Sequence, residues 1–288
     1  MGRAFEVVTG VLTTSALTAG TYAAYTANSG QSFSIRASNG VPSASLLSPW
    51  SQAGGAGYVQ VKSPRMHDTT IGTTYAAQIG TAAFGADPLA ALDFDEPAYS
   101  TDTLTVQFTP AVTIAAATSM GIGLPVFYND LNGVNASLAT WPQISSMIST
   151  ASKIGDHYVS WVSASSAATA GQIGVGVAVN STNDQFKANH SYALLGYLPQ
   201  RQVGSVLLQG TDTGNLYVGG PGSLNVKDTR NFFVDLSLAQ NLPLIPVIQA
   251  NNRNNTFVSV VDAASTATAT VVGLIWMDLG VLASPIAA

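Results

Sequence analysis

The sequence predicts an all-β protein with two tandem jelly-roll sandwiches in one chain, a double jelly roll, joined by a short linking helix. Three observations predict this fold class. Apolar and polar residues alternate with a period of two over several stretches, which is typical of strands with one buried face. Short motifs of the first half recur in the same order in the second half. Hydrophobic residues make up 47% of the 288 residues, enough for a large core, although charged residues make up only 9%.

Six stretches alternate clearly enough to be predicted as strands, and Gly, Asn, Pro and Asp clusters separate them as turns do. They are residues 103–108, 158–163, 173–179, 232–238, 256–261 and 268–274. Residues 1–27 alternate in the same way. Because Glu6 and several Thr and Ser interrupt their apolar run, we expect a strand of the mature protein there and no signal peptide.

One helix is predicted over residues 142–153, where apolar residues recur at helical spacing and a glycine follows. A short second helix is compatible with residues 71–92, although three glycines disfavour it. Trp161 and Trp276 fall within alternating strands and are predicted to lie in the core. Trp50 lies in a Ser-Pro-Trp-Ser segment and is predicted to be an exposed ring.

The duplication consists of five correspondences between the two halves. Residues 15–20 match 166–171, 31–33 match 184–186, 44–47 match 192–195, 57–59 match 204–206, and 123–127 match 244–248. The offset falls from 151 to 121, which one insertion in the first half would explain. The predicted organisation is therefore a first jelly roll over 1–140 with an insertion near 73–100, a linking helix over 141–155, and a second jelly roll over 156–288.

The charge content excludes several classes of function. Ten basic and fifteen acidic residues give a net charge of −5 and leave no basic stripe for nucleic acid. No cysteine is present, so disulfides, Cys zinc sites and thiol nucleophiles are excluded, and no apolar run is long enough for a transmembrane helix. A surface so poor in charge is unusual for a free monomer and favours burial against other subunits.

No motif in the chain indicates catalysis, so we predict that the protein is not an enzyme and assign no catalytic, cofactor-binding or metal-binding residue. The three histidines show no metal-binding spacing. His67 and Asp68 beside Arg65 are better explained as a polar loop, since Asp212 and Asn215 stand at the matching place in the second half. Residues 219–222 are glycine-rich but lack the rest of a phosphate-binding loop.

One local cluster of carboxylates leaves alternatives open. Asp93, Asp95 and Glu96, with Asp102 nearby, have enough oxygens to contribute to a calcium site. They also have the chemistry of a glycosidase acid/base pair, which needs one carboxylate on each side of a cleft. A solvated loop explains the same residues without any ligand, and no cofactor is predicted.

The duplicated β-sandwiches, the linking helix, the uncharged Ala/Thr/Ser/Gly-rich strands and the lack of cysteine together resemble the double jelly-roll major capsid proteins of tailless icosahedral viruses, especially those of bacteriophages. The resemblance is architectural and covers nearly the whole chain. It implies a structural virion protein, a major capsid protein whose homotrimers form pseudo-hexagonal capsomers of an icosahedral shell. It implies no catalytic residues, and interfaces that are apolar and depleted in charge.

The same resemblance implies neighbouring capsomers and minor capsid or vertex proteins as partners, no specific nucleic-acid binding, and a location in the virion capsid. An internal membrane is left open. Residues 73–100 and the loop at 211–227 are candidates for an outer tower or for contacts between subunits. The alternative is a tandem β-sandwich adhesin or carbohydrate-binding protein, with tryptophans and tyrosines as sugar platforms. A hydrolase on a jelly-roll scaffold is the third possibility.

Overall fold

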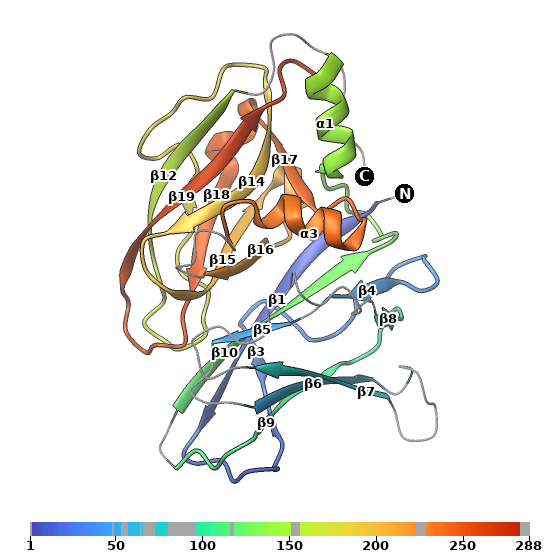
Figure 1. The fold of residues 1–288 in the computed structure, drawn as a ribbon, viewed down its shortest axis with the longest axis vertical. Helices are drawn as coiled ribbons and strands as arrows, with labels where there is room; N and C mark the ends of the chain where they lie inside the picture. The colour runs from blue at the N-terminus through green and yellow to red at the C-terminus, as the bar shows by residue number, and fades with distance from the viewer. Residues whose placement is uncertain are drawn as a thin grey trace.

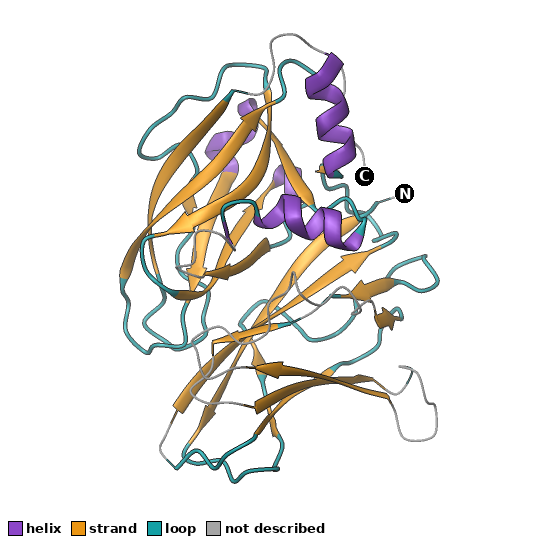
Figure 2. Cartoon of the chain, in the orientation of Figure 1, coloured by secondary structure: helices purple, strands orange, loops and turns teal. Residues whose placement is uncertain are grey.

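In a computed structural model, the structure describes residues 2–47, 49–52, 57–63, 65, 73–79, 96–115, 118–150, 156–222 and 229–282. The strands in this part of the chain form four antiparallel sheets, which pair into two sandwiches. Figure 1 shows one sandwich above the other, and Figure 2 shows how few helices accompany them. The predicted all-β class is confirmed.

The first sandwich is built by strands from the N-terminal part of the chain. They are β1 (Ala4–Thr14), β2 (Ala23–Ala24), β3 (Thr26–Ala27), β4 (Ala44–Leu46), β5 (Trp50–Gln52), β6 (Gly57–Ser63), β7 (Thr73–Ile79), β8 (Glu96–Ala98), β9 (Thr105–Pro110) and β10 (Thr118–Tyr128). One sheet has the order β1-β10-β4-β8, with β5 also on β10 and β3 on β1, and the other has the order β2-β9-β6-β7.

The second sandwich repeats this topology. Its strands are β12 (His157–Ser165), β13 (Val177–Ala178), β14 (Ser191–Pro199), β15 (Val203–Gly210), β16 (Val218–Gly222), β17 (Ile245–Gln249), β18 (Thr256–Val261) and β19 (Ala269–Asp278). The sheet orders are β12-β19-β14-β17 and β13-β18-β15-β16. With the strands lettered B to I along the chain, both halves have one B-I-D-G sheet and one C-H-E-F sheet, which is the double jelly roll.

The strand order also tests the five sequence correspondences. The first four fall on equivalent connections or strands of the two jelly rolls. The fifth is wrong, because residues 123–127 lie on strand I of the first jelly roll (β10) and residues 244–248 lead into strand G of the second (β17). The true partner of β10 is β19, so the offset stays near 151 and gives no ground for an insertion. Most of the predicted insertion, residues 80–95, lies outside the described residues.

Between the jelly rolls, the predicted helix is present as α1 (Trp141–Thr150). Just before it, the short strand β11 (Leu138–Ala139) pairs with β17 at the edge of the second B-I-D-G sheet. The chain therefore contacts the second jelly roll before the helix begins.

Two strand predictions need correction. Residues 232–238 form most of a helix, α3 (Phe232–Gln240), which ends at Asn241 in the left-handed conformation (φ 52°). Their alternation reflects a short run that is buried on several sides, and such a run does not distinguish strand from helix. In 173–179 only β13 is a regular strand, and Ile173 forms an isolated bridge to Val261.

Two loop or helix predictions also differ from the structure. Residues 73–79, in the stretch compatible with a second helix, form β7, and residues 80–92 lie outside the described residues. Residues 211–227, expected as one loop, contain the 3-10 helix η1 (Thr211–Thr213) and β16. All five residues of β16 are buried, so its sequence Val-Gly-Gly-Pro-Gly has no polar face to alternate. A further 3-10 helix, η2 (Ala250–Asn255), precedes β18.

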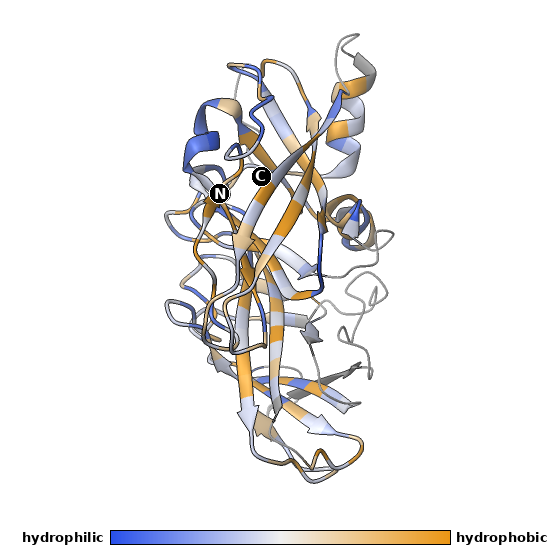
Figure 3. Ribbon diagram, turned by 90° about the vertical axis from the view of Figure 1, so that its left-hand side faces the viewer, coloured by the Kyte–Doolittle hydropathy of each residue, from blue (hydrophilic) through white to orange (hydrophobic). Residues whose placement is uncertain are grey.

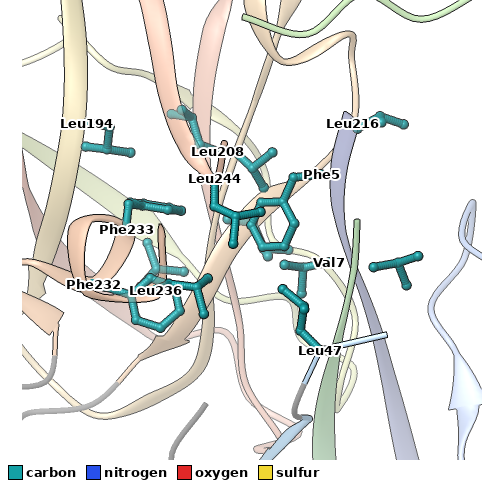
Figure 4. Close-up of a cluster of buried hydrophobic side chains, with 14 of the residues drawn as sticks. Phe5, Val7, Leu47, Leu194, Leu208, Leu216, Phe232, Phe233, Leu236 and Leu244 are labelled. Carbon is teal, nitrogen blue, oxygen red and sulfur yellow. The ribbon is translucent and has the colours of Figure 1, made fainter. Parts of the chain in front are cut away.

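The core is continuous across both jelly rolls. Strands are pale or orange on the hydropathy scale along most of their length (Figure 3). Figure 4 shows one buried cluster to which β1, the segment after β4, strands of the second jelly roll and α3 all contribute side chains. Within the described residues, no helix combines the length and apolar character needed to span a membrane.

Candidate functional site: the contact faces of the two jelly rolls

The two jelly rolls contact each other through unlike faces. Strands β1, β5 and β10 of the first B-I-D-G sheet lie against β15 and β16 of the second C-H-E-F sheet, as Figure 1 shows. Because of this contact, β15 and β16 are buried on both faces, and even the polar side chain of Ser205 in β15 is buried. The outward face of one jelly roll thus becomes interior to the molecule.

Trp50 is the largest side chain in this contact. It stands opposite Gly123 in the β5–β10 pairing, and a Cβ atom at Gly123 would lie 2.3 Å from the Trp50 ring, so glycine is what lets the ring lie over β10. The indole Nε1 donates a hydrogen bond to Ser205 Oγ of the second jelly roll (3.0 Å). Its ring meets Phe232 of α3 edge to face, with centroids 6.5 Å apart.

The expectation of an exposed Trp50 is therefore wrong, since the side chain is 1% exposed. Trp276 lies in the core as predicted, and its Nε1 donates to Ser160 Oγ (2.8 Å). Trp161, predicted to be buried, is 42% exposed on the outward face of β12. Period-two alternation identifies the two faces of a strand, but it does not say which face another jelly roll covers.

Contacts along the interface show that the two jelly rolls run in the same direction. Near the start of β1, the Val7 amide donates to the Tyr217 carbonyl (2.7 Å), in the connection between strands E and F. Near the end of β1, Val11 lies against Gly171, in the connection between strands B and C of the second jelly roll. Equivalent ends of the two jelly rolls therefore lie at the same end of the molecule.

A contact between unlike faces leaves a complementary pair of faces unused. Among the described residues, the main strand-to-strand contacts between the jelly rolls involve neither the C-H-E-F sheet of the first nor the B-I-D-G sheet of the second. A heterologous contact of this kind can be repeated from copy to copy, and it gives a closed ring when the rotation closes. The two unused faces are therefore the candidate functional surface of the molecule.

Along its described strands β6 and β9, the first unused face carries little charge. Along β6 and β9 the side chains alternate between buried and outward. The outward ones are Tyr58, Gln60, Lys62, Thr105, Gln107 and Thr109, of which one is charged. Tyr58 is 43% exposed, and Tyr22 beside it is 54% exposed and accepts a hydrogen bond from Gln60 Nε2 (3.1 Å). Exposed rings on a sheet face with little charge are typical of contact surfaces.

The second unused face carries a groove with a mixed apolar and polar lining. Outward side chains of β12, β14 and β19 line it together with the residues that lead into α3, and its volume is ≈ 510 Å³. The lining comprises His157, Tyr158, Val159, Leu195, Leu198, Arg230, Asn231 and Ile275. Trp161 stands next to it on β12, and its ring lies over Gly273 of β19, where a Cβ atom would be 2.8 Å from the ring.

The carboxylates singled out in the sequence do not form a described site. Asp93 and Asp95 lie outside the described residues, and so do His67 and Asp68; Glu96 begins β8. Asp102 is buried, accepts a hydrogen bond from Ser63 Oγ (2.9 Å) and pairs with Arg65 Nε (3.3 Å). Asp102 thus ties the end of strand E to the connection that leads to strand H. Asp212 is likewise engaged, accepting from the Gln249 amide (3.0 Å).

Sequence reasoning missed an ion pair in the first jelly roll that joins a buried carboxylate to a half-exposed arginine. Glu6 of β1 is 2% exposed and accepts two hydrogen bonds from Arg36, from Nε (2.8 Å) and Nη2 (2.6 Å). The hydrogen bond to Glu6 raises the pKa of the Arg36 guanidinium. The Arg36 amide donates to Tyr128 Oη (3.3 Å), so the connection between strands C and D is fixed to both β1 and β10.

The second jelly roll has a matching ion pair. Lys187 lies 151 residues after Arg36, its Nζ donates to Asp278 Oδ2 (3.0 Å), and its amide donates to Tyr192 Oη (2.8 Å). Burial raises the pKa of the Asp278 carboxyl, but hydrogen bonds from His190, the Gly280 amide and Lys187 outweigh burial and lower it below its ordinary value. The only sequence feature that could have predicted these pairs is that Arg36 and Lys187 are separated by the same 151 residues as the two halves of the duplication.

A polar cavity of ≈ 250 Å³ lies next to this second ion pair. It is lined by Asp156, His157, Tyr158, Gln185, Lys187, Tyr192 and Asp278. His190 Nδ1 lies 2.8 Å from Asp278 Oδ1, outside the lining. Within the described part of the chain, no three His, Cys, Asp or Glu side chains group closely enough to hold a metal ion. Because Asp278 is already paired, this cluster acts as a structural charge network.

Comparison with known proteins gives no family. No protein-family model matches the sequence, and no curated protein matches it. Among solved structures, the chain is similar to the PBSX exported protein XepA, with 12% identity, a TM-score of 0.27, and coverage of 93% of this chain and 86% of that one.

Two further similar structures come from viruses. One belongs to work on the triple jelly roll fold and turret assembly in an archaeal virus, with 9% identity, a TM-score of 0.22, and coverage of 93% of this chain and 59% of that one. The other belongs to Sulfolobus Turreted Icosahedral Virus, with 9% identity, a TM-score of 0.22, and coverage of 95% and 61%. The chain thus spans about three fifths of both viral chains. With TM-scores below 0.5, we draw no argument from these similarities.

Proposed function

We propose that the chain is a structural virion protein, a major capsid protein whose homotrimers form the pseudo-hexagonal capsomers of an icosahedral shell. The observation that carries the proposal is the internal contact between unlike faces of two jelly rolls, which leaves the complementary pair of faces open. Three chains joined head to tail through these faces would place six jelly rolls around one axis. Under this proposal the chain resides in the capsid and has no enzymatic role.

The composition supports the same proposal. Only 25 of the 288 side chains are charged, and ten of them form five ion pairs within the described residues: Glu6–Arg36, Asp102–Arg65, Asp278–Lys187, Asp262–Arg201 and Asp184–Arg253. Obligate interfaces are apolar and depleted in charge, and a subunit contacted on two opposite faces needs such surfaces on both. The proposed partners are therefore copies of the chain in the same capsomer, neighbouring capsomers, and minor capsid or vertex proteins.

The test is the native mass of the purified chain by light scattering, with negative-stain images of the same sample. We expect particles of three times 29.6 kDa that are hexagonal in outline, or closed shells built from them. A monomer that is stable at high protein concentration would overturn the proposal, because the two open faces would then have no copy to bind.

One observation favours the alternative function, a carbohydrate-binding protein or adhesin. Trp161 exposes 42% of its surface beside the groove, whose lining includes the polar residues Arg230 and Asn231, and an exposed ring near polar groups is suited to stacking on a sugar. Glycan-array binding by a monomer, lost in Trp161→Ala, would support this alternative. Trimer formation without glycan binding would overturn it.

A further inference from the structure

The outward faces of the two B-I-D-G sheets both carry a tryptophan ring over a glycine of strand I. In both jelly rolls, strand I carries an outward glycine, Gly123 in β10 and Gly273 in β19, and a tryptophan ring lies over it. Trp50 reaches Gly123 from strand D, and Trp161 reaches Gly273 from strand B. Trp50 is buried in the internal contact, whereas its counterpart Trp161 is the exposed one.

The opposite faces are comparable in the same way. Tyr58 and Ser205 hold equivalent places on strand E, in the matched segments 57–59 and 204–206. Ser205 is small and buried, and its Oγ accepts a hydrogen bond from Trp50 Nε1. Tyr58 is large and exposed.

On strand D the larger side chain is in the first jelly roll's contact face and the smaller one is on the second jelly roll's free face. Leu198 stands opposite Gly273 just as Trp50 stands opposite Gly123. Leu198 lines the ≈ 510 Å³ groove, whereas the Trp50 ring fills the equivalent place in the first jelly roll. In the internal contact, the large Trp50 on strand D therefore meets the small Ser205 on strand E. On the two free faces the sizes are reversed: strand D has the smaller Leu198 and a groove, and strand E has the large Tyr58 ring.

We propose that Trp161 and the adjacent groove of the second jelly roll bind the first C-H-E-F face of another copy, with Tyr58 of that copy in the groove. The inference rests on the proposed function and names the contact that closes the ring. The first ground is that the internal contact joins the same two kinds of face. The second is that the side-chain sizes are complementary in both contacts: the large Trp50 faces the small Ser205, and the smaller Leu198 would face the large Tyr58. The near absence of charge along β6 and β9 around Tyr58 fits the apolar part of the groove at Leu195, Leu198 and Ile275.

The first arm of the test measures assembly. Trp161→Ala is expected to weaken trimer formation about tenfold or more in sedimentation or mass photometry, since exposed aromatic residues at the centre of an interface are often the ones that dominate binding. Val112→Ala is the control, because Val112 is 63% exposed but lies in the connection between β9 and β10, away from both faces. Circular dichroism of both variants verifies that each is folded.

The second arm does not depend on the Trp161 variant. The chain has no cysteine, so Tyr58→Cys with Leu198→Cys introduces the only two thiols. Mild oxidation should join chains through disulfides between copies, whereas Val112→Cys with Leu198→Cys should leave them separate. A wild-type trimer that is insensitive to Trp161→Ala and gives no Tyr58–Leu198 cross-link overturns this inference and leaves the proposed function standing. A wild-type monomer overturns both.

Discussion

Each jelly roll fixes its connection between strands C and D with a cation, a buried carboxylate and a tyrosine hydroxyl. In the first, Arg36 is the only cation that the structure pairs with Glu6 in the described residues. In the second, Asp278 accepts from His190 and the Gly280 amide as well as from Lys187. The two carboxylates are about equally buried, so the number of their partners is the main difference between the two pairs.

We therefore expect Arg36→Ala to lower the free energy of unfolding by about 1–3 kcal/mol, because it leaves the buried Glu6 carboxylate without the hydrogen bonds that Arg36 donates. Lys187→Ala should cost clearly less, since Asp278 keeps its other two partners. Urea unfolding followed by fluorescence measures both. Adding Glu6→Gln to Arg36→Ala should recover part of the loss, and equal losses in the two single variants would contradict this explanation.

At this scale the sequence predicted little of the site. Ion pairs such as Glu6–Arg36 join residues 30 positions apart with no local motif, and Trp50 and Trp161 exchanged their predicted exposures. Both outcomes depend on which face of a sheet is covered, and this is decided by packing between the two halves.

Among the elements, the strands with one outward face were predicted best. Strands β12 and β9 are found within two residues of their predicted bounds, because their side chains alternate between core and surface. Elements covered on several sides, such as β16 and α3, were missed or assigned to the wrong class. Burial on every side removes the polar positions from which a period can be recognised.

Whether residues 232–240 form the helix α3 or a strand can be tested by mutation. A strand would place Leu236 and Leu238 on one face, whereas the helix buries Leu236 and leaves Leu238 52% exposed. We expect Leu236→Ala to cost about 2–5 kcal/mol of unfolding free energy and Leu238→Ala to cost less than about 1 kcal/mol. Thermal unfolding of the two variants checks this, and similar losses would argue for a strand.

For the whole molecule, the repeated strand order and the single continuous core describe two jelly rolls that share one core. The sequence predicted the duplication because four short matches lie at equivalent places. It failed at the fifth, where two proline-containing apolar strands, β10 and β17, look alike although they hold different places. Sheet order is set by pairings between distant segments, which a linear comparison of motifs does not detect.

Because the internal contact couples the two halves, we expect the wild-type chain to unfold in one cooperative transition. Trp50→Ala should lower the unfolding free energy by about 3–5 kcal/mol and broaden or split that transition in calorimetry. Trp161→Ala, measured at concentrations where the chain is monomeric, should cost about 1 kcal/mol or less because its ring is already partly in water. A single sharp transition in Trp50→Ala would show that the halves are coupled by other contacts.

Covalent linkage gives the contact at Trp50 a property that a contact between separate chains lacks. Bringing two free partners together costs translational and rotational entropy, and their association follows mass action, so it is lost on dilution. The Trp50 contact joins parts of one polypeptide and is formed at any concentration once the chain folds. Half of the contacts in a six-membered ring would then be permanent, and the amount of protein in the cell would control only the other half.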